Sequence, residues 1–195
     1  MTVDLTVTPP VDRSRKAEIL LGRDLAMMAT AAKYDLAQAR EGTRSFHELT
    51  CLFFRLADAL RTDMFIEVTD RETTLDDAFG WSEFKRAACR IASTGAPKAV
   101  LTGARHVLGR TALMMIEVED RRYWSGQRWP RPQVLSYLFD LGLVPVARDF
   151  RSRYVYDILL LRAELLDSAE PIRGMLREFN STSYQSYQGR SRQHR

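Results

Sequence analysis

Three carboxylates stand together at the end of one predicted strand. The apolar run Ala112–Val118 meets Glu117 near its end, and Glu119 and Asp120 follow at once. Carboxylates at the end of a buried strand stand where an α/β sheet presents its ligand-binding groups. They can accept hydrogen bonds from a hydroxyl group and polarise it for reaction. We therefore take Glu119 and Asp120 as candidate catalytic residues, with Glu119 polarising the hydroxyl.

Aromatic side chains follow these acids in a polar segment that we predict to be a loop. Tyr123, Trp124 and Trp129 stand there. Rings beside carboxylates suit a sugar or another polyhydroxylated molecule, because CH faces pack on rings while hydroxyls meet oxygens. We expect Glu117, Tyr123 and Trp124 to bind the substrate. In the alternative reading, the rings fold back onto the sheet, and the acids pair with the loop arginines Arg121, Arg122, Arg128 and Arg131.

The surrounding pattern predicts one α/β domain. We expect a flexible start over 1–12, a single domain over 13–179 and a disordered basic tail over 180–195. Two helices should come first, one after Ser14 and one opened by a capping box of Ser45 and Glu48. The buried face of the second helix should be Leu49, Leu52, Phe53, Leu56 and Leu60.

The later elements alternate between strand and helix patterns. The apolar runs Met64–Val68 and Ala112–Val118 are typical of central strands. Helices are predicted over 82–93, from Pro97 onward, over 132–141 and over 171–179. Gly142, just past the helix over 132–141, is typical of a helix end. The strands Val144–Ala147 and Val155–Leu161 should be antiparallel because their connection is short.

The segments IEVEDRRYW and GLVPVARDF resemble FkbM-type methyltransferases, a Rossmann-like class I family. The resemblance covers Gly95–Leu166 well and Ser45–Val68 moderately. It implies a sheet flanked by helices with an antiparallel last strand, S-adenosylmethionine as cofactor and O-methyl transfer. The implied acceptor is a hydroxyl of a sugar, glycolipid or secondary metabolite.

The same resemblance implies that part of the cofactor-binding half is missing. Glu67 ends the strand Met64–Val68, where the family has a cofactor-binding acid, but Thr69 stands where a glycine is expected. The family's second and third strands have no counterpart. We therefore predict a reduced Rossmann-like sheet with Met64–Val68 beside Ala112–Val118, and weak or absent cofactor binding. The alternative function is a catalytically inactive remnant that acts as a binding or partner protein.

Composition restricts the other classes of function. The net charge is +4, and no recognition motif or strong basic stripe predicts nucleic-acid binding. Two cysteines and three scattered histidines predict neither a disulfide framework nor a metal site. The chain has no apolar run of the roughly 20 residues that a membrane span needs. We expect a cytoplasmic protein whose partner is a small molecule.

Overall fold

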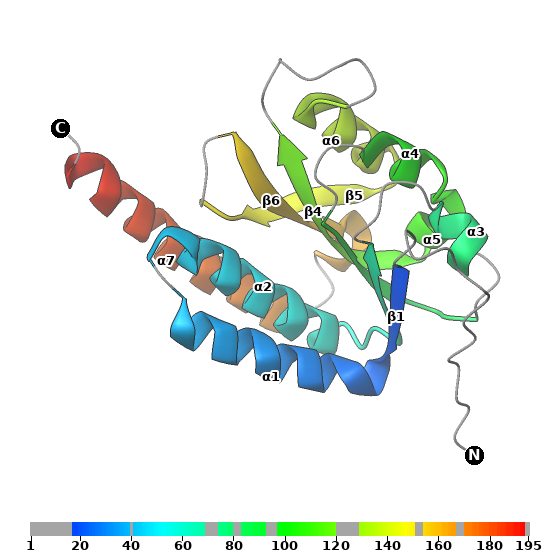
Figure 1. The fold of residues 1–195 in the computed structure, drawn as a ribbon, viewed down its shortest axis with the longest axis horizontal. Helices are drawn as coiled ribbons and strands as arrows, with labels where there is room; N and C mark the ends of the chain where they lie inside the picture. Colours follow the sequence, from blue (N-terminus) through cyan, green and yellow to red (C-terminus); the bar gives the residue numbers. More distant parts are fainter. Residues whose placement is uncertain are drawn as a thin grey trace.

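The computed structural model describes residues 17–39, 41–68, 74–79, 83–92, 97–119, 129–150, 154–166 and 170–193 (Figure 1). They form a mixed α/β fold around a six-stranded sheet of order β1-β2-β3-β4-β6-β5. This arrangement confirms the predicted reduced Rossmann-like sheet, flanked by helices and with an antiparallel last strand. The strands are β1 Ala17–Leu21, β2 Met64–Val68, β3 Ala87–Ile91, β4 Thr111–Glu119, β5 Leu143–Arg148 and β6 Val155–Arg162.

The strands fall into a parallel half and an antiparallel half. β2, β3 and β4 are parallel neighbours, whereas β6 lies antiparallel between β4 and β5. The predicted antiparallel pairing of the last two strands is therefore confirmed. β1 pairs antiparallel with β2 and forms the far edge.

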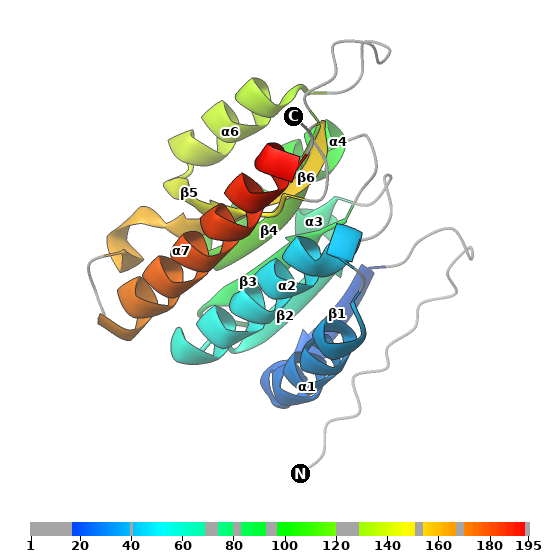
Figure 2. The same ribbon diagram turned by 90° about the vertical axis from the view of Figure 1, so that its left-hand side faces the viewer.

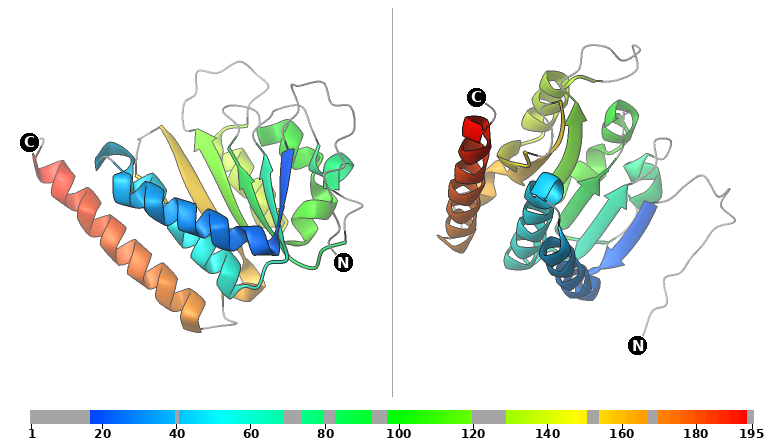
Figure 3. Two further views of the ribbon diagram at one scale, coloured as in Figure 1. Left: turned by 60° about the horizontal axis from the view of Figure 1, so that its bottom comes forward. Right: turned by 60° about the vertical axis from the view of Figure 1, so that its left-hand side comes forward.

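Helices cover both faces of the sheet (Figure 2). One face carries α1 (Gly22–Gln38), α2 (Glu41–Ala59) and α7 (Glu170–Gln193), and we call it the α2 face. The other face, the α6 face, carries α3 (Leu75–Phe79), α4 (Pro97–Thr102), α5 (Arg105–Gly109) and α6 (Arg131–Asp140). Figure 3 shows the two helical layers from further directions.

The apolar side of α2 is buried as its spacing predicted. Phe53 and Phe54 meet Phe65 of β2 with ring centroids 5.9 and 5.6 Å apart. Burial of large aromatic side chains dominates such a core, and their edge contacts add a smaller term. The predicted residues are all buried: Leu49, Leu52, Phe53, Leu56 and Leu60.

The predicted helix over 82–93 is wrong, because this segment contains β3. Ala87, Cys89 and Ile91 face the α6 side, while Ala88 faces the α2 side. Small apolar residues on both faces suit a strand buried between two others, and an apolar run of this length does not distinguish strand from helix. The carboxylate of Asp63 fixes the entry to β3 by accepting the backbone N–H groups of residues 85 and 86, each at 2.8 Å.

β3 also corrects the predicted neighbours at the centre of the sheet. We expected β2 beside β4, but β3 pairs with both of them, in the register Ile66–Cys89–Met114. The sheet is thus reduced, as predicted, but by fewer strands than the sequence suggested.

The start of the chain differs from its helical pattern. The predicted first helix begins only at Gly22, because Ala17–Leu21 pairs with β2 as a strand. The proposed capping box is also wrong, since α2 begins at Glu41 and Ser45 lies inside it. The Ser45 hydroxyl accepts the backbone N–H of Phe150 at 3.1 Å, and Glu48 pairs with Arg44. Ser45 therefore ties the helix to the end of β5.

The predicted helix from Pro97 is divided into α4 and α5. The break is at Gly103, where a Cβ would lie 2.4 Å from Cβ of Thr74, so a side chain there would clash. Asp76 then opens α5 by accepting the N–H groups of His106 and Val107, each at 3.0 Å. These contacts satisfy amides that a helix start leaves without partners.

The helix predicted over 132–141 is confirmed as α6. Gly142 follows it with a φ of +79°, and its N–H donates to the carbonyl of Phe139 at 2.8 Å. A glycine suits this position because a side chain is strained at positive φ.

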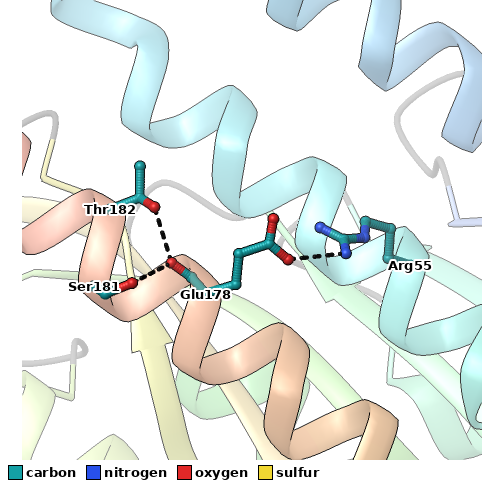
Figure 4. Close-up of polar contacts among 4 residues, drawn as sticks. All are labelled: Arg55, Glu178, Ser181 and Thr182. Atoms are coloured by element: carbon teal, nitrogen blue, oxygen red, sulfur yellow. Dashed lines mark hydrogen bonds and ion pairs between the residues drawn. The ribbon is translucent and has the colours of Figure 1, made fainter.

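The final helix is longer than predicted. It was expected to end at Phe179 and to be followed by a disordered tail, but α7 continues to Gln193. Arg55 pairs with Glu178 at 3.2 Å, and the hydroxyls of Ser181 and Thr182 donate to the Glu178 carbonyl (Figure 4). A helix already formed and packed extends at little cost, so its polar end, which projects beyond the sheet in Figure 1, stays helical. Residues 1–12 of the predicted flexible start lie outside the described residues.

None of the helices in the described ranges combines the length and the apolar composition needed to span a bilayer.

Candidate functional site at the carboxyl edge of the sheet

Ionisable residues gather on the α2 face where the parallel strands end. Glu67 of β2 stands beside Arg90 of β3, and Glu117 of β4 stands opposite Asp157 of β6. Strand alternation places all four on the α2 face, because each is two residues from a residue of the core on that side. The sequence patterns that build the sheet therefore also collect these charges at one edge.

Glu67, the predicted cofactor contact, has a partner within the protein. Its Oε1 lies 3.0 Å from Nη1 of Arg90, and the two side chains are only 18% and 20% exposed. The Arg90 guanidinium also lies 5.7 Å from the ring centroid of Phe46, on α2. The structure thus places Glu67 at the predicted strand end and gives it an ion pair beneath a helix.

Two of the predicted acids lie at the end of β4. Glu117 faces Asp157 directly across the antiparallel pair, and Glu119 faces Val155. Asp157 is 4% exposed, and Asp149, at the end of β5, is fully buried. The backbone of Asp149 donates to the Asp157 carbonyl at 3.1 Å. Carboxylate oxygens accept hydrogen bonds and attract positive groups, so this edge can bind hydroxyls or cations.

The other predicted residues of this site have different outcomes. Asp120, Tyr123 and Trp124 fall in 120–128, outside the described residues. Trp129 folds back onto the α6 face, with its ring 5.2 Å from that of Tyr137. The alternative reading, in which an aromatic residue of this loop packs on the core, therefore holds for Trp129.

Several residues of this edge were missed in the sequence. Asp157 is an acid inside the apolar run of β6. Because a buried charge needs a partner, its position in this run could have indicated a specific role. Arg90 carried no such signal, because its segment was interpreted as a helix with a solvated side. Arg148 and Tyr156 were missed because only the pairing of β5 with β6 brings them together.

The described residues do not fit a Rossmann-type cofactor site. Such sites form where the strand order reverses, so that successive crossover helices cover opposite faces. Here β2, β3 and β4 follow one another in a single direction, and the helices between them all lie on the α6 face. Glu67, the acid proposed to contact the cofactor, is held by Arg90. We therefore derive no step through S-adenosylmethionine.

Behind this edge, Cys89 is a buried thiol and a reporter of folding. Burial raises the pKa of Cys89 to about 12, although its contact with the Thr111 hydroxyl at 3.4 Å acts in the opposite direction. The thiolate is therefore disfavoured in the folded protein, and the thiolate is the reactive form. Burial raises the pKa of Cys51 as well, but that side chain is only partly buried.

We predict that Cys89 resists alkylation in the native state and reacts on unfolding. At pH 8, iodoacetamide should modify Cys51 first, and mass spectrometry of peptides should find Cys89 unmodified. Because the folded pKa is raised, the thiol's contribution to stability is complete below about pH 9 and decreases as pH rises towards 12, by about 1.4 kcal/mol per unit. The stability of Cys89→Ala should not show this decrease with pH. Rapid native labelling of Cys89 would contradict the buried position.

The residues described hold no cluster of three or more histidine, cysteine or acidic side chains able to bind a metal ion. Comparisons with protein-family models, with curated proteins and with solved structures found no match to this chain.

Proposed function

We propose that the chain is a methyltransferase-like binding protein that holds a polyhydroxylated small molecule at the carboxyl edge of its sheet. The observation that carries this proposal is the Glu67–Arg90 ion pair. Glu67 is the acid expected to bind the cofactor, and in this structure it binds Arg90 instead. The same edge keeps the acids of the acceptor side, Glu117 and Glu119, joined by Asp157. Their oxygens would accept hydrogen bonds from hydroxyls of a sugar, a glycolipid headgroup or a secondary metabolite.

The second candidate is O-methyl transfer from S-adenosylmethionine to such a hydroxyl. It is supported by the resemblance and by one observation, the antiparallel β6 between β4 and β5, because class I methyltransferases also have an antiparallel last strand. In that function Glu119 and Asp120 would polarise the acceptor hydroxyl. Tyr123 and Trp124 would pack against the acceptor.

Titration calorimetry with S-adenosylmethionine separates the two candidates. For the binding protein we expect no saturable heat at ligand concentrations below about 1 mM, because lost polar contacts cost roughly 1–3 kcal/mol each. A dissociation constant in the low micromolar range would overturn the proposal and support methyl transfer. In that case Glu67→Gln should weaken the cofactor's binding.

Glu119→Gln should remove binding of the hydroxylated molecule while leaving the fold intact. The variant keeps the shape of the side chain but loses a charged acceptor of hydrogen bonds. Saturation-transfer NMR with a panel of saccharides should show contacts for the wild type and lose most of the signal in the variant. The midpoint of thermal unfolding should change by less than about 2 °C.

The matched control for this variant is Glu83→Gln, an exposed acid before β3, at the opposite end of the strands. It should leave both the NMR contacts and the unfolding midpoint unchanged. If Glu119→Gln instead lowers the midpoint by several degrees, Glu119 is structural and the binding role should be dropped.

The proposed location is the cytoplasm. It is supported by the two cysteines, both of which are free thiols in the structure, since free thiols are typical of reducing compartments.

A further inference from the structure

The α6 face of the same edge carries two arginines that meet at one tyrosine, whereas Arg90 on the α2 face is paired with Glu67. Tyr156 is a fully buried residue of β6 on the α6 side. Arg131, the first residue of α6, donates from Nη1 to the Tyr156 hydroxyl at 2.8 Å. Arg148, the last residue of β5, lays its guanidinium 3.6 Å from the centroid of the Tyr156 ring. Two guanidinium groups therefore converge on one buried phenol.

Among the described residues, a backbone carbonyl and two aromatic rings hold Arg148 in place. Its Nε donates to the backbone carbonyl of Asp149 at 3.1 Å, and the ring of Phe150 lies 5.3 Å away on another side. Within the described ranges, no carboxylate lies within ion-pair distance of Arg148. A stacked guanidinium whose terminal amino groups make no hydrogen bond to the described residues is preorganised for two parallel hydrogen bonds to an oxyanion.

Strand alternation directs the acids of β4 and β6 to the face opposite Tyr156. Val118 and Tyr156 belong to the core of the α6 face, so their neighbours Glu117, Glu119 and Asp157 point to the α2 face. The acids of β4 and β6 therefore lie on the α2 face together with the Glu67–Arg90 pair, while Arg131 and Arg148 contact Tyr156 on the α6 face. An anion bound on the α6 face would contact the two guanidinium groups. The carboxylates of β4 and β6 lie on the opposite face of the sheet.

We propose that Arg148, Arg131 and Tyr156 form a binding site for a phosphate group. Arg148 supplies two terminal donors, Arg131 adds a second positive charge, and Tyr156 holds both by its ring and its hydroxyl. Two positive charges match a dianion, and a phosphate offers the oxygens that a guanidinium contacts in pairs. The site lies on the opposite face from the carboxylates and does not depend on the proposed function.

The phosphate is either the free ion or part of a monoester, and NMR titrations of the protein distinguish the two sources. Inorganic phosphate and glucose 6-phosphate are added separately at fixed ionic strength, up to about 10 mM, with glucose as the uncharged control. We expect saturable shifts with both phosphates and none at these residues with glucose. Tighter binding of the ester by tenfold or more assigns the site to phosphorylated molecules, whereas equal affinity assigns it to the free ion.

Variants of Arg148 test the geometry of the site. Arg148→Met keeps the stacking volume but removes the charge, and we expect the association constant to decrease about tenfold or more. Arg148→Lys keeps the charge but loses the planar pair of donors, and an intermediate loss of about threefold is expected. The control is Arg110→Lys, since Arg110 stacks on Phe84 at 4.0 Å and lies at the opposite edge, before β4. It should bind phosphate as the wild type does.

Two results would overturn the site. One is a wild-type protein without saturable phosphate-dependent shifts. The other is an Arg148→Met variant that binds phosphate as tightly as the wild type. Because Arg148→Met could also perturb the fold, Tyr156→Phe provides a second test: it keeps the ring but releases Arg131, so binding should weaken severalfold while the circular dichroism spectrum is unchanged.

Discussion

Arg162→Met is expected to lower the free energy of unfolding by about 3 kcal/mol, because one guanidinium satisfies three carbonyls. Its Nε donates to Thr111 O at 2.8 Å and Nη1 donates to Leu141 O at 3.0 Å. Nη2 donates to the carbonyl of Leu108. These carbonyls lie at the ends of α5 and α6 and at the start of β4, so Arg162 joins three elements.

For a protein of this size, the loss should lower the unfolding midpoint by roughly 6–12 °C, measured by calorimetry. Burial lowers the pKa of Arg162 from its ordinary value, as expected for a guanidinium partly removed from water. The unfolding midpoint of Arg162→Lys should lie between those of the wild type and Arg162→Met, since an ammonium cannot reach all three oxygens. The control is Arg173→Met, in an exposed pair with Glu170, which should cost under about 0.5 kcal/mol. Similar effects of both methionine variants would contradict the role of Arg162.

The Glu67–Arg90 pair should show a large coupling energy in a double-mutant cycle. Glu67→Gln or Arg90→Met alone leaves the remaining charge mostly buried, and each should cost about 2–3 kcal/mol. The double variant should cost much less than the sum, because neither charge is then left without its partner. Urea denaturation of the four proteins measures the coupling, which we expect to be about 2 kcal/mol.

An exposed pair of the same length serves as the control. Arg44 and Glu48 also lie 3.0 Å apart, but the arginine is 60% exposed, and their coupling should be about 0.3–0.5 kcal/mol. This cycle also bears on function. If Glu67 instead served a ligand, Glu67→Gln would weaken that ligand's binding and leave stability nearly unchanged, and the structural role of the pair would be refuted.

The sequence alone determined the elements with strong local signals. The strands β2 and β4 are apolar on almost every position, and α6 carries proline at its start and glycine past its end, so each was predicted within one residue. The short link between β5 and β6 determined their antiparallel pairing. The acids Glu117 and Glu119 were found because they interrupt or follow an apolar run.

The tertiary structure decided what local patterns leave ambiguous. The segment of β3 has small apolar residues that suit a helix or a strand, and only its place between β2 and β4 selects the strand. Ser45 matched a helix cap, yet its hydroxyl bonds residue 150, far along the chain. The partners of Glu67 and Tyr156 were equally hidden, since they come from other strands and helices. Local sequence sets the spacing of side chains along one element, whereas ion pairs and stacked arginines depend on which elements become neighbours, and that is decided by burial of the whole core.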